Sequence, residues 1–235
     1  MVYVTGDLHG DMNRFKTAAA KRLQPGDTLL VCGDFGFIWD GSKQEEKNLE
    51  KLGEKKYNIC FVDGTHENFD MLDRFEVSEW NGGKVHHIIG GVYHLMRGQV
   101  YEIEGLSVFA MGGGESPDMD IRLTNGNWYP QESPSQEEMV EGATNMARYN
   151  NKVDIVLTHE PSAKVKEFLQ MPQPKSSASS RVTLLNTYFE ELSGAVEYKK
   201  WYFGSLHMDK YVSATQVAVF NHILEVESAK NILKL

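Results

Sequence analysis

The sequence has no run of Lys or Arg, and its 24 basic residues are outnumbered by 33 acidic ones, giving a net charge of −9. Because a dedicated nucleic-acid surface needs clustered basic side chains, this balance argues against nucleic-acid binding and disfavours a DNA nuclease. A long apolar segment is also missing, and the chain opens directly on a strand-like stretch, Met1 to Val4. We therefore expect a cytoplasmic protein with neither a signal peptide nor a membrane span.

Cysteine is scarce. Only Cys32 and Cys60 occur, each inside an apolar run and neither in a Cys-x-x-Cys motif. This pattern favours two reduced thiols in the core of a cytosolic protein over a redox role. With 41% hydrophobic residues, the chain has enough apolar side chains for a sizeable core.

Short apolar runs alternate with helical patterns in the first half of the chain, which predicts βαβ units in a parallel or mixed sheet. The expected strands are residues 2–5, 28–32 and 58–62. The expected helices are residues 11–22, 42–53, which opens with a capping box, and 67–75. Four closely spaced strands should then form a second sheet as a meander: 85–89, 91–96, 99–103 and 106–111.

The second half contains a long segment, residues 112–134, rich in Gly, Pro, Asp and Asn, which predicts a loop that is either functional or disordered. Ser135 and Glu138 then form a second capping box for a helix to about residue 149. Further elements are expected at 154–157, from 161, at 182–192 and at 200–203, with a mobile stretch at 172–180 and a final hairpin over 211–226. No repeat or linker interrupts this order, which predicts a single domain over residues 1–235.

Five short polar clusters directly follow apolar runs, and they contain two aspartates and four of the eight histidines. They are Asp7-Leu8-His9, Gly33-Asp34, Gly64-Thr65-His66-Glu67, Thr158-His159-Glu160 and Gly204-Ser205-Leu206-His207. Ligands of parallel α/β sheets bind outside the carboxyl ends of the strands, so these clusters are expected to converge. Imidazole and carboxylate are ligands of zinc, manganese and iron, and the pattern therefore predicts a metal centre.

The order Asp-x-His, Gly-Asp, Gly-x-His-Glu, His and Gly-x-x-His resembles the calcineurin-like metallophosphoesterase superfamily, in a compact bacterial or prophage-type form. The segment Gly113 to Asp118, Arg122 and the segment Trp128 to Glu132 are similar to that branch as well. The resemblance implies a four-layer α/β/β/α sandwich, in which helices flank two mixed sheets. It also implies hydrolysis of a phosphomonoester or phosphodiester by metal-activated hydroxide.

The resemblance assigns ligands to two metal positions. The first metal would be held by Asp7, His9, Asp34 and His207. The second would share Asp34 and take His159, together with an Asn and a His that this chain replaces with Thr65 and Ser205. Neutral hydroxyls bind transition metals poorly, so we expect one firmly bound divalent ion (Mn, Zn, Fe or Ni) and a second ion that is weak or absent.

By the same resemblance, His66 is the catalytic residue that protonates the leaving oxygen or orients the phosphate. The expected substrate is a small phosphorylated molecule or a nucleotide. Phe35 follows the Gly-Asp pair where protein serine/threonine phosphatases continue with Asp-Arg-Gly, which disfavours that subclass. The loss of two ligands leaves an alternative open, a degenerate family member that binds a phosphorylated ligand without efficient hydrolysis.

Other residues near the clusters have more than one interpretation. Arg122 and Arg181 are candidate substrate contacts, the latter on a lid over residues 172–181 or on a plain solvent loop. The aromatic residues after the motifs could stack on an aryl or nucleoside leaving group or simply pack in the core or rim: Phe37, Trp39 and Trp128. Glu67 and Glu160 follow motif histidines, where they could orient an imidazole or place charge at a helix start.

Overall fold

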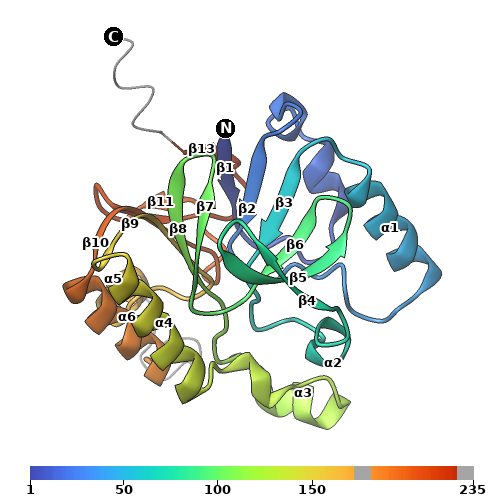
Figure 1. The fold of residues 1–235 in the computed structure, drawn as a ribbon. Coiled ribbons are helices and arrows are strands. Elements are labelled where there is room, and N and C mark those ends of the chain that lie inside the picture. Colours follow the sequence, from blue (N-terminus) through green and yellow to red (C-terminus); the bar gives the residue numbers. More distant parts are fainter. Residues whose placement is uncertain (172–180, 227–235) are drawn as a thin grey trace.

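The computed structural model describes residues 1–171 and 181–226, in which two mixed β-sheets pack face to face between two groups of helices (Figure 1). The first sheet has the strand order β13-β1-β2-β3-β6-β5-β4. Its strands are β1 (Val2–Thr5), β2 (Thr28–Val31), β3 (Asn58–Phe61), β4 (Val77–Trp80), β5 (Gly83–Ile89), β6 (Val92–Leu95) and β13 (Leu224–Glu225). The strands β1, β2, β3 and β6 are parallel, whereas β13, β5 and β4 join antiparallel.

The second sheet has the order β11-β12-β10-β9-β8-β7. Its strands are β7 (Gln99–Ile103), β8 (Leu106–Met111), β9 (Lys152–Thr158), β10 (Glu197–Phe203), β11 (Lys210–Tyr211) and β12 (Gln216–Ala218). Strands β8, β9, β10 and β12 are parallel, and β7 and β11 pair antiparallel at the two edges.

Helices cover the outer face of each sheet. The first sheet is flanked by two 3₁₀ helices and two α-helices: η1 (Met12–Lys16), η2 (Ala20–Arg22), α1 (Lys43–Gly53) and α2 (Phe69–Leu72). The second sheet is flanked by α4 (Gln136–Arg148), α5 (Ala163–Gln170) and α6 (Leu184–Ala195). Two further short elements, α3 (Met119–Asn125) and η3 (Pro130–Glu132), lie in the connection between β8 and α4.

Three apolar cores separate the four layers. Val4, Leu30 and Leu157 belong to the core between the sheets, and β1 and β2 are buried over their whole length. A second core, with Phe61, lies between the first sheet and its helices, and a third, with Trp201, lies under α4, α5 and α6. Strands buried on both faces must be apolar throughout, which is why these runs were recognisable in the sequence. The predicted sandwich of two mixed sheets is confirmed.

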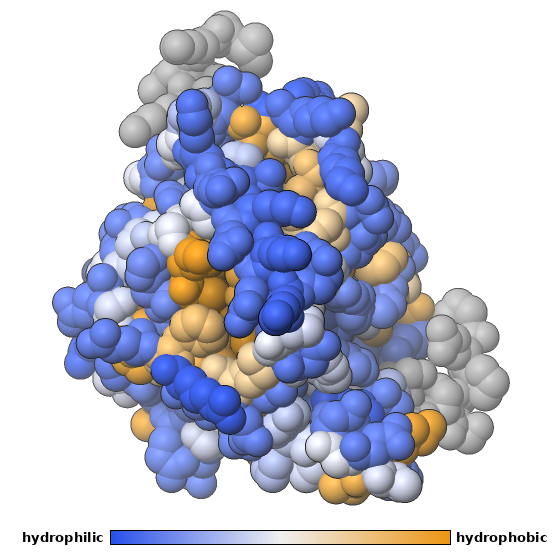
Figure 2. All heavy atoms as spheres, turned by 90° about the vertical axis from the view of Figure 1, so that its right-hand side faces the viewer, coloured by the Kyte–Doolittle hydropathy of each residue, from blue (hydrophilic) through white to orange (hydrophobic). Residues whose placement is uncertain are grey.

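Cys32 and Cys60 are buried and unpaired, as expected. On the face at the right of Figure 1, hydrophilic side chains dominate and apolar ones are exposed in smaller patches (Figure 2). Within residues 1–171 and 181–226, no helix combines the length and apolar character needed to cross a bilayer.

The sheet assignment of the middle strands was wrong. β5 and β6 extend the first sheet, because β6 pairs in parallel with β3, and only β7 and β8 start the second sheet. The final hairpin was also only half right, since β11 and β12 pair in the second sheet while β13 returns to β1 in the first. Spacing along the chain indicates where strands are, but the choice of partner depends on the packing of the whole domain.

The sequence predicted the starts of helices better than their interiors. Ser135 and Glu138 form the reciprocal capping box, and Ser42 caps α1, although Glu45 turns its carboxylate to the preceding loop instead. The helix expected over residues 11–22 is two 3₁₀ turns, interrupted by extended backbone at Thr17. The segment 112–134, expected to be a loop, contains α3 and η3. Strand β4 was not predicted, because it is an exposed edge strand without the apolar pattern of a buried strand. Residues 172–180, predicted to be mobile, lie outside the described residues.

Candidate metal centre

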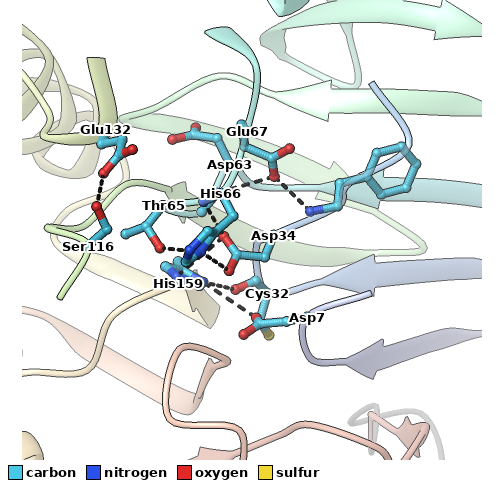
Figure 3. A network of polar contacts seen from close by, with 12 residues as sticks. Asp7, Cys32, Asp34, Asp63, Thr65, His66, Glu67, Ser116, Glu132 and His159 are labelled. Carbon is cyan, nitrogen blue, oxygen red and sulfur yellow. Dashed lines mark hydrogen bonds and ion pairs between the residues drawn. The ribbon is translucent and has the colours of Figure 1, made fainter. Parts of the chain in front are cut away.

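The five polar clusters meet where the two sheets adjoin. Three follow the neighbouring strands β1, β2 and β3 of the first sheet, and two follow the neighbouring strands β9 and β10 of the second. Strands β1, β2 and β3 are parallel to one another, and so are β9 and β10. The carboxyl ends of these strands therefore lie together in one region. Figure 3 shows Asp7, Asp34, His66 and His159 turned toward one another there.

Four side chains converge closely enough to share one metal ion. Donor atoms of Asp7, His9, Asp34 and His207 all lie within 4.8 Å of one another. His207 Nε2 is 3.0 Å from His9 Nε2 and 3.1 Å from Asp7 Oδ2, and His9 Nε2 is 3.8 Å from Asp34 Oδ2. Metal–ligand bonds of about 2.0–2.2 Å would place the donors of a tetrahedral site roughly 3.3–3.6 Å apart. The observed spacings bracket that range.

The chemistry of Asp7 also fits a cation. This carboxylate is fully buried, and neither of its oxygens accepts a hydrogen bond from the described residues. A buried carboxylate without hydrogen bonds is costly, and the groups that pair with Asp7 among the described residues are the imidazoles of His207 and His159 (3.4 Å from Oδ1). A divalent ion held with His9 and Asp34 would satisfy it.

The backbone at these ligands is strained. His9, Asp34 and His207 have φ values of 47°, 41° and 49°, in the left-handed region that non-glycine residues seldom adopt. The carbonyl of Asp34 accepts hydrogen bonds from the amides of Leu8 (3.1 Å) and His9 (2.8 Å), which joins the first two clusters. Strain of this kind concentrates at functional sites, where the surrounding structure maintains it.

The motif glycines leave room for the ligands. A Cβ atom on Gly64 would lie 2.0 Å from Asp34 Oδ1, and one on Gly204 would lie 2.2 Å from Asp7 Oδ1. Both contacts are far inside van der Waals distance, so any larger residue would displace a metal ligand. The glycines in the polar clusters therefore serve the site directly.

The residues that the family resemblance assigns to a second metal position are His159, Thr65 and Ser205, beside the shared Asp34. His159 Nε2 lies 3.7 Å from Asp34 Oδ1, and its Nδ1 donates to the carbonyl of Cys32 at 3.0 Å, which leaves Nε2 free to act as a ligand. Thr65 Oγ1 is instead 3.1 Å from His66 Nδ1, and Ser205 Oγ is buried without a hydrogen-bond partner among the described residues. Thus the structure brings the two replaced positions to the site, but with hydroxyls in place of an amide and an imidazole.

Ion pairs shift the pKa of the carboxylate and imidazole at this position. Burial alone would raise the pKa of Asp34, but the neighbouring His159 and the hydrogen bonds from His66 hold it well below its usual range. Burial would lower the pKa of His159, whereas Asp34 and Asp7 raise it well above its ordinary value. Such an imidazole keeps a proton until a metal displaces it.

His66 lies beside the first site and is held from both ring nitrogens. Nδ1 is 3.0 Å from Asp34 Oδ2, and Nε2 is 3.4 Å from Asp118 Oδ2. The backbone amide of His66 also donates to Asp34 Oδ1 at 2.8 Å. Asp118 was not singled out as a site residue by itself, although it ends the segment 113–118 that resembles a family loop.

Arg122 lies beneath the site rather than in its opening. Its guanidinium is buried, forms an ion pair with Glu132, and donates to the carbonyls of Thr65 and Asn127, both at 2.7 Å. Glu132 in turn accepts from Ser116 Oγ at 2.7 Å, as Figure 3 shows. This arrangement fixes the loop that carries His66.

Arg181, the other arginine candidate, is exposed and pairs with Glu115. It lines a cavity of about 310 Å³ together with Ser205 and the buried Lys166. The other residues of the possible lid, 172–180, lie outside the described residues. A substrate role for either arginine stays a prediction.

The two glutamates after motif histidines hold loops and contact no imidazole. Glu67 accepts from the amides of Phe35 (2.7 Å) and Gly64 (3.4 Å), and burial together with the nearby Asp34 raises its pKa to about 8. Glu160 forms a buried ion pair with Lys166 at 2.8 Å. Neither side chain caps a helix.

A further buried network reaches the site from behind. Asp63, just before the Gly64 cluster, accepts from Arg97 Nε (3.0 Å) and contacts His94 Nε2 (3.1 Å), and His94 Nδ1 lies 3.0 Å from His86 Nδ1. The two histidines belong to strands β6 and β5, and no motif in the sequence predicts their contact with Asp63.

Comparison with known proteins identifies the family of this chain. The model of the calcineurin-like phosphoesterase family matches residues 1–220, and the chain therefore belongs to that family. Among solved structures, the phosphopantetheinyl hydrolase of Mycobacterium tuberculosis is similar, with a TM-score of 0.43 and 15% sequence identity over 93% of this chain and 89% of that chain. A search of curated proteins found no match.

Proposed function

We propose that the protein is a metal-dependent phosphoric ester hydrolase that acts on a small phosphorylated molecule or a nucleotide. The observation that carries this proposal is the convergence of four metal donors within 4.8 Å, next to a histidine held by a shared ligand, Asp34. Membership of a phosphoesterase family supports the reaction class. The acidic net charge of −9 favours a small substrate over a nucleic acid.

Asp7, His9, Asp34 and His207 would hold the first ion. Two imidazoles and two carboxylates suit manganese, zinc, iron or nickel. When bound, such an ion supplies Lewis acidity to a phosphoryl oxygen.

His66 is the group placed to handle the leaving oxygen. Asp34 occupies Nδ1, so Nε2 is the nitrogen directed away from the ligands. Asp118 near Nε2 would orient the ring and keep a proton on that nitrogen, from which it can pass to the leaving group. General acid assistance typically contributes about 10²–10⁴-fold.

The second ion would bind weakly or not at all. Asp34 is shared with the first site, so among the described residues His159 is the one imidazole or carboxylate that would belong to the second position alone. A clamp of two ions on the attacking and leaving oxygens would therefore be impaired. This same observation supports the second candidate function, a family member that binds a phosphorylated ligand without efficient hydrolysis.

An assay with 4-nitrophenyl phosphate and bis(4-nitrophenyl) phosphate, with manganese added, tests the proposal. We expect turnover above the metal blank, and a loss of about 10²–10⁴-fold in kcat for His66→Asn when phenyl phosphate, whose leaving oxygen needs the proton, is the substrate. His222→Asn, which changes an exposed imidazole, is the matched control. If folded, metal-loaded protein hydrolyses neither ester, the hydrolase assignment fails and the binding function remains.

A further inference from the structure

A cavity of about 430 Å³ opens beside His9 and His66 and extends toward the start of α1. This volume lies in the range of small-molecule pockets, about 300–1,000 Å³. Gly36 and Phe37 form part of its wall, and Trp39 is one of its larger lining side chains. The cavity therefore connects the proposed proton donor with a recess that the metal ligands do not fill.

The part of the wall that carries Trp39 is held in place from two sides. The carboxylate of Glu45 accepts hydrogen bonds from the amides of Trp39 (2.7 Å) and Asp40 (2.9 Å). Asn68 Nδ2 donates to the carbonyl of Trp39 at 2.6 Å, which ties the loop to a residue two positions after His66. A wall fixed in this way loses little freedom when a ligand binds.

The lining has a distinct chemistry. Besides the indole of Trp39, it contains the amides of Gln44 and Asn48, which are hydrogen-bonded to each other at 3.0 Å. The described residues of the lining include the carboxylates of Asp40 and Glu45 but neither lysine nor arginine. A second phosphate would find neither lysine nor arginine among the described lining residues, whereas an uncharged planar group could stack on the indole and bond to the amides.

We propose that this cavity binds an uncharged, planar aromatic group of the phosphate ester, with Trp39 as the stacking wall and Gln44 and Asn48 as its hydrogen-bonding edge. The inference rests on the proposed function, because it places the phosphate at the metal centre and the organic group beside His66. Of the three aromatic residues considered from the sequence, Trp39 is assigned this role. Phe37, although it touches the cavity, is 1% exposed and packs in the core against Phe35.

Phosphonates test binding apart from hydrolysis, since an ester hydrolase does not cleave their P–C bond. Metal-loaded protein is titrated by calorimetry with 4-nitrobenzylphosphonate, ethylphosphonate and inorganic phosphate. We expect the aromatic probe to bind at least about tenfold more tightly than ethylphosphonate, and Trp39→Ala to remove that difference. Trp39→Phe keeps a planar face and should retain most of it. Lys47→Ala, an exposed position on α1, should change none of the three affinities.

Equal affinity for the aromatic and ethyl probes would overturn the inference, as would no binding of any probe. The inference would also be overturned if Trp39→Ala lost as much affinity for inorganic phosphate as for the aromatic probe, because that result indicates general damage to the site. Failure of the proposed function looks different. In that case Trp39-dependent binding persists while 4-nitrophenyl phosphate is not hydrolysed. Conversely, hydrolysis of 4-nitrophenyl phosphate together with equal affinity for the aromatic and ethyl phosphonates retains the function and rejects the pocket.

Discussion

The Nε2 atoms of His9 and His207 lie 3.0 Å apart although 198 residues separate them in the chain. His9 follows β1 of one sheet and His207 follows β10 of the other, so their contact requires both sheets to be formed and packed. Two imidazole nitrogens directed at each other at this distance need a proton or a cation between them. We assign the position between these two nitrogens to a metal ion.

His207→Asn should weaken metal binding at the first site by at least about tenfold, because it removes one of four donors. The measurement is competition against a chelating dye, with circular dichroism to verify the fold. His222→Asn is the control, since this imidazole is 70% exposed and pairs only with Asp209 among the described residues. Unchanged affinity in His207→Asn would show that the metal is held elsewhere.

Thr65→Asn combined with Ser205→His should raise the number of bound ions per chain and increase the rate of ester hydrolysis. The reason is that the double variant supplies an amide oxygen and an imidazole to the position that now has only His159 and the shared Asp34. Elemental analysis of dialysed protein gives the ion count, and the 4-nitrophenyl phosphate assay gives the rate. If neither quantity changes, these two positions do not limit the site.

Arg97→Met should destabilise the fold by about 3–5 kcal/mol, because it leaves the buried carboxylate of Asp63 without its guanidinium partner. The same arginine also bonds to Gln131 and Glu138, so the start of α4 would loosen. Urea unfolding measures the change. Lys84→Met is the matched control, since its ion pair with Glu141 is exposed and such pairs contribute about 0–1 kcal/mol. Similar losses in both variants would contradict the role of the buried pair.

The buried His86 should make stability depend on pH. Burial and the neighbouring His94 lower the pKa of His86 from 6.5 to about 4. Between these values the unfolded chain binds more protons than the folded one, so the free energy of unfolding falls as pH drops from 6.5 to 4, by at most about 1.4 kcal/mol per pH unit. Urea unfolding at several pH values should show a shallower fall for His86→Gln, whereas the exposed His87→Gln should follow the parent chain. Parallel profiles for His86→Gln and the parent would refute this.

The elements that the sequence predicted well have strong local signals. Strands β1 and β2 are buried on both faces and are apolar apart from one threonine each, and Ser135 caps α4 through contacts three residues apart. The failures involve long-range choices. Nothing near β6 in the chain indicates that it pairs with β3, where Phe61 lies opposite His94, 33 residues further along the chain. The buried contact between Asp63 and His94 spans 31 residues and carries no sequence signal either. The exposed strand β4 lacks an apolar face because it lies at an edge.

For the site, the sequence and a family pattern indicated which side chains gather, because each follows a strand. Their support could not be foreseen in the same way. Asp118 reaches His66 across 52 residues, and Arg122 binds the carbonyl of Thr65 across 57. Every residue has a backbone carbonyl, so the sequence does not show that the carbonyl of Thr65 is held by an arginine. For that reason Arg122 could be proposed only as a possible substrate contact. The cavity wall at Trp39 likewise depends on Glu45, which the sequence presented as a helix cap.

We propose a metal centre with one complete site and one deficient site. Counting bound ions in the parent chain, by elemental analysis after dialysis and by anomalous scattering from crystals, tests it most directly. We predict one ion per chain, coordinated by Asp7, His9, Asp34 and His207, with at most partial occupancy beside His159. Two fully occupied ions of similar affinity would contradict the claim, and so would a chain that binds none.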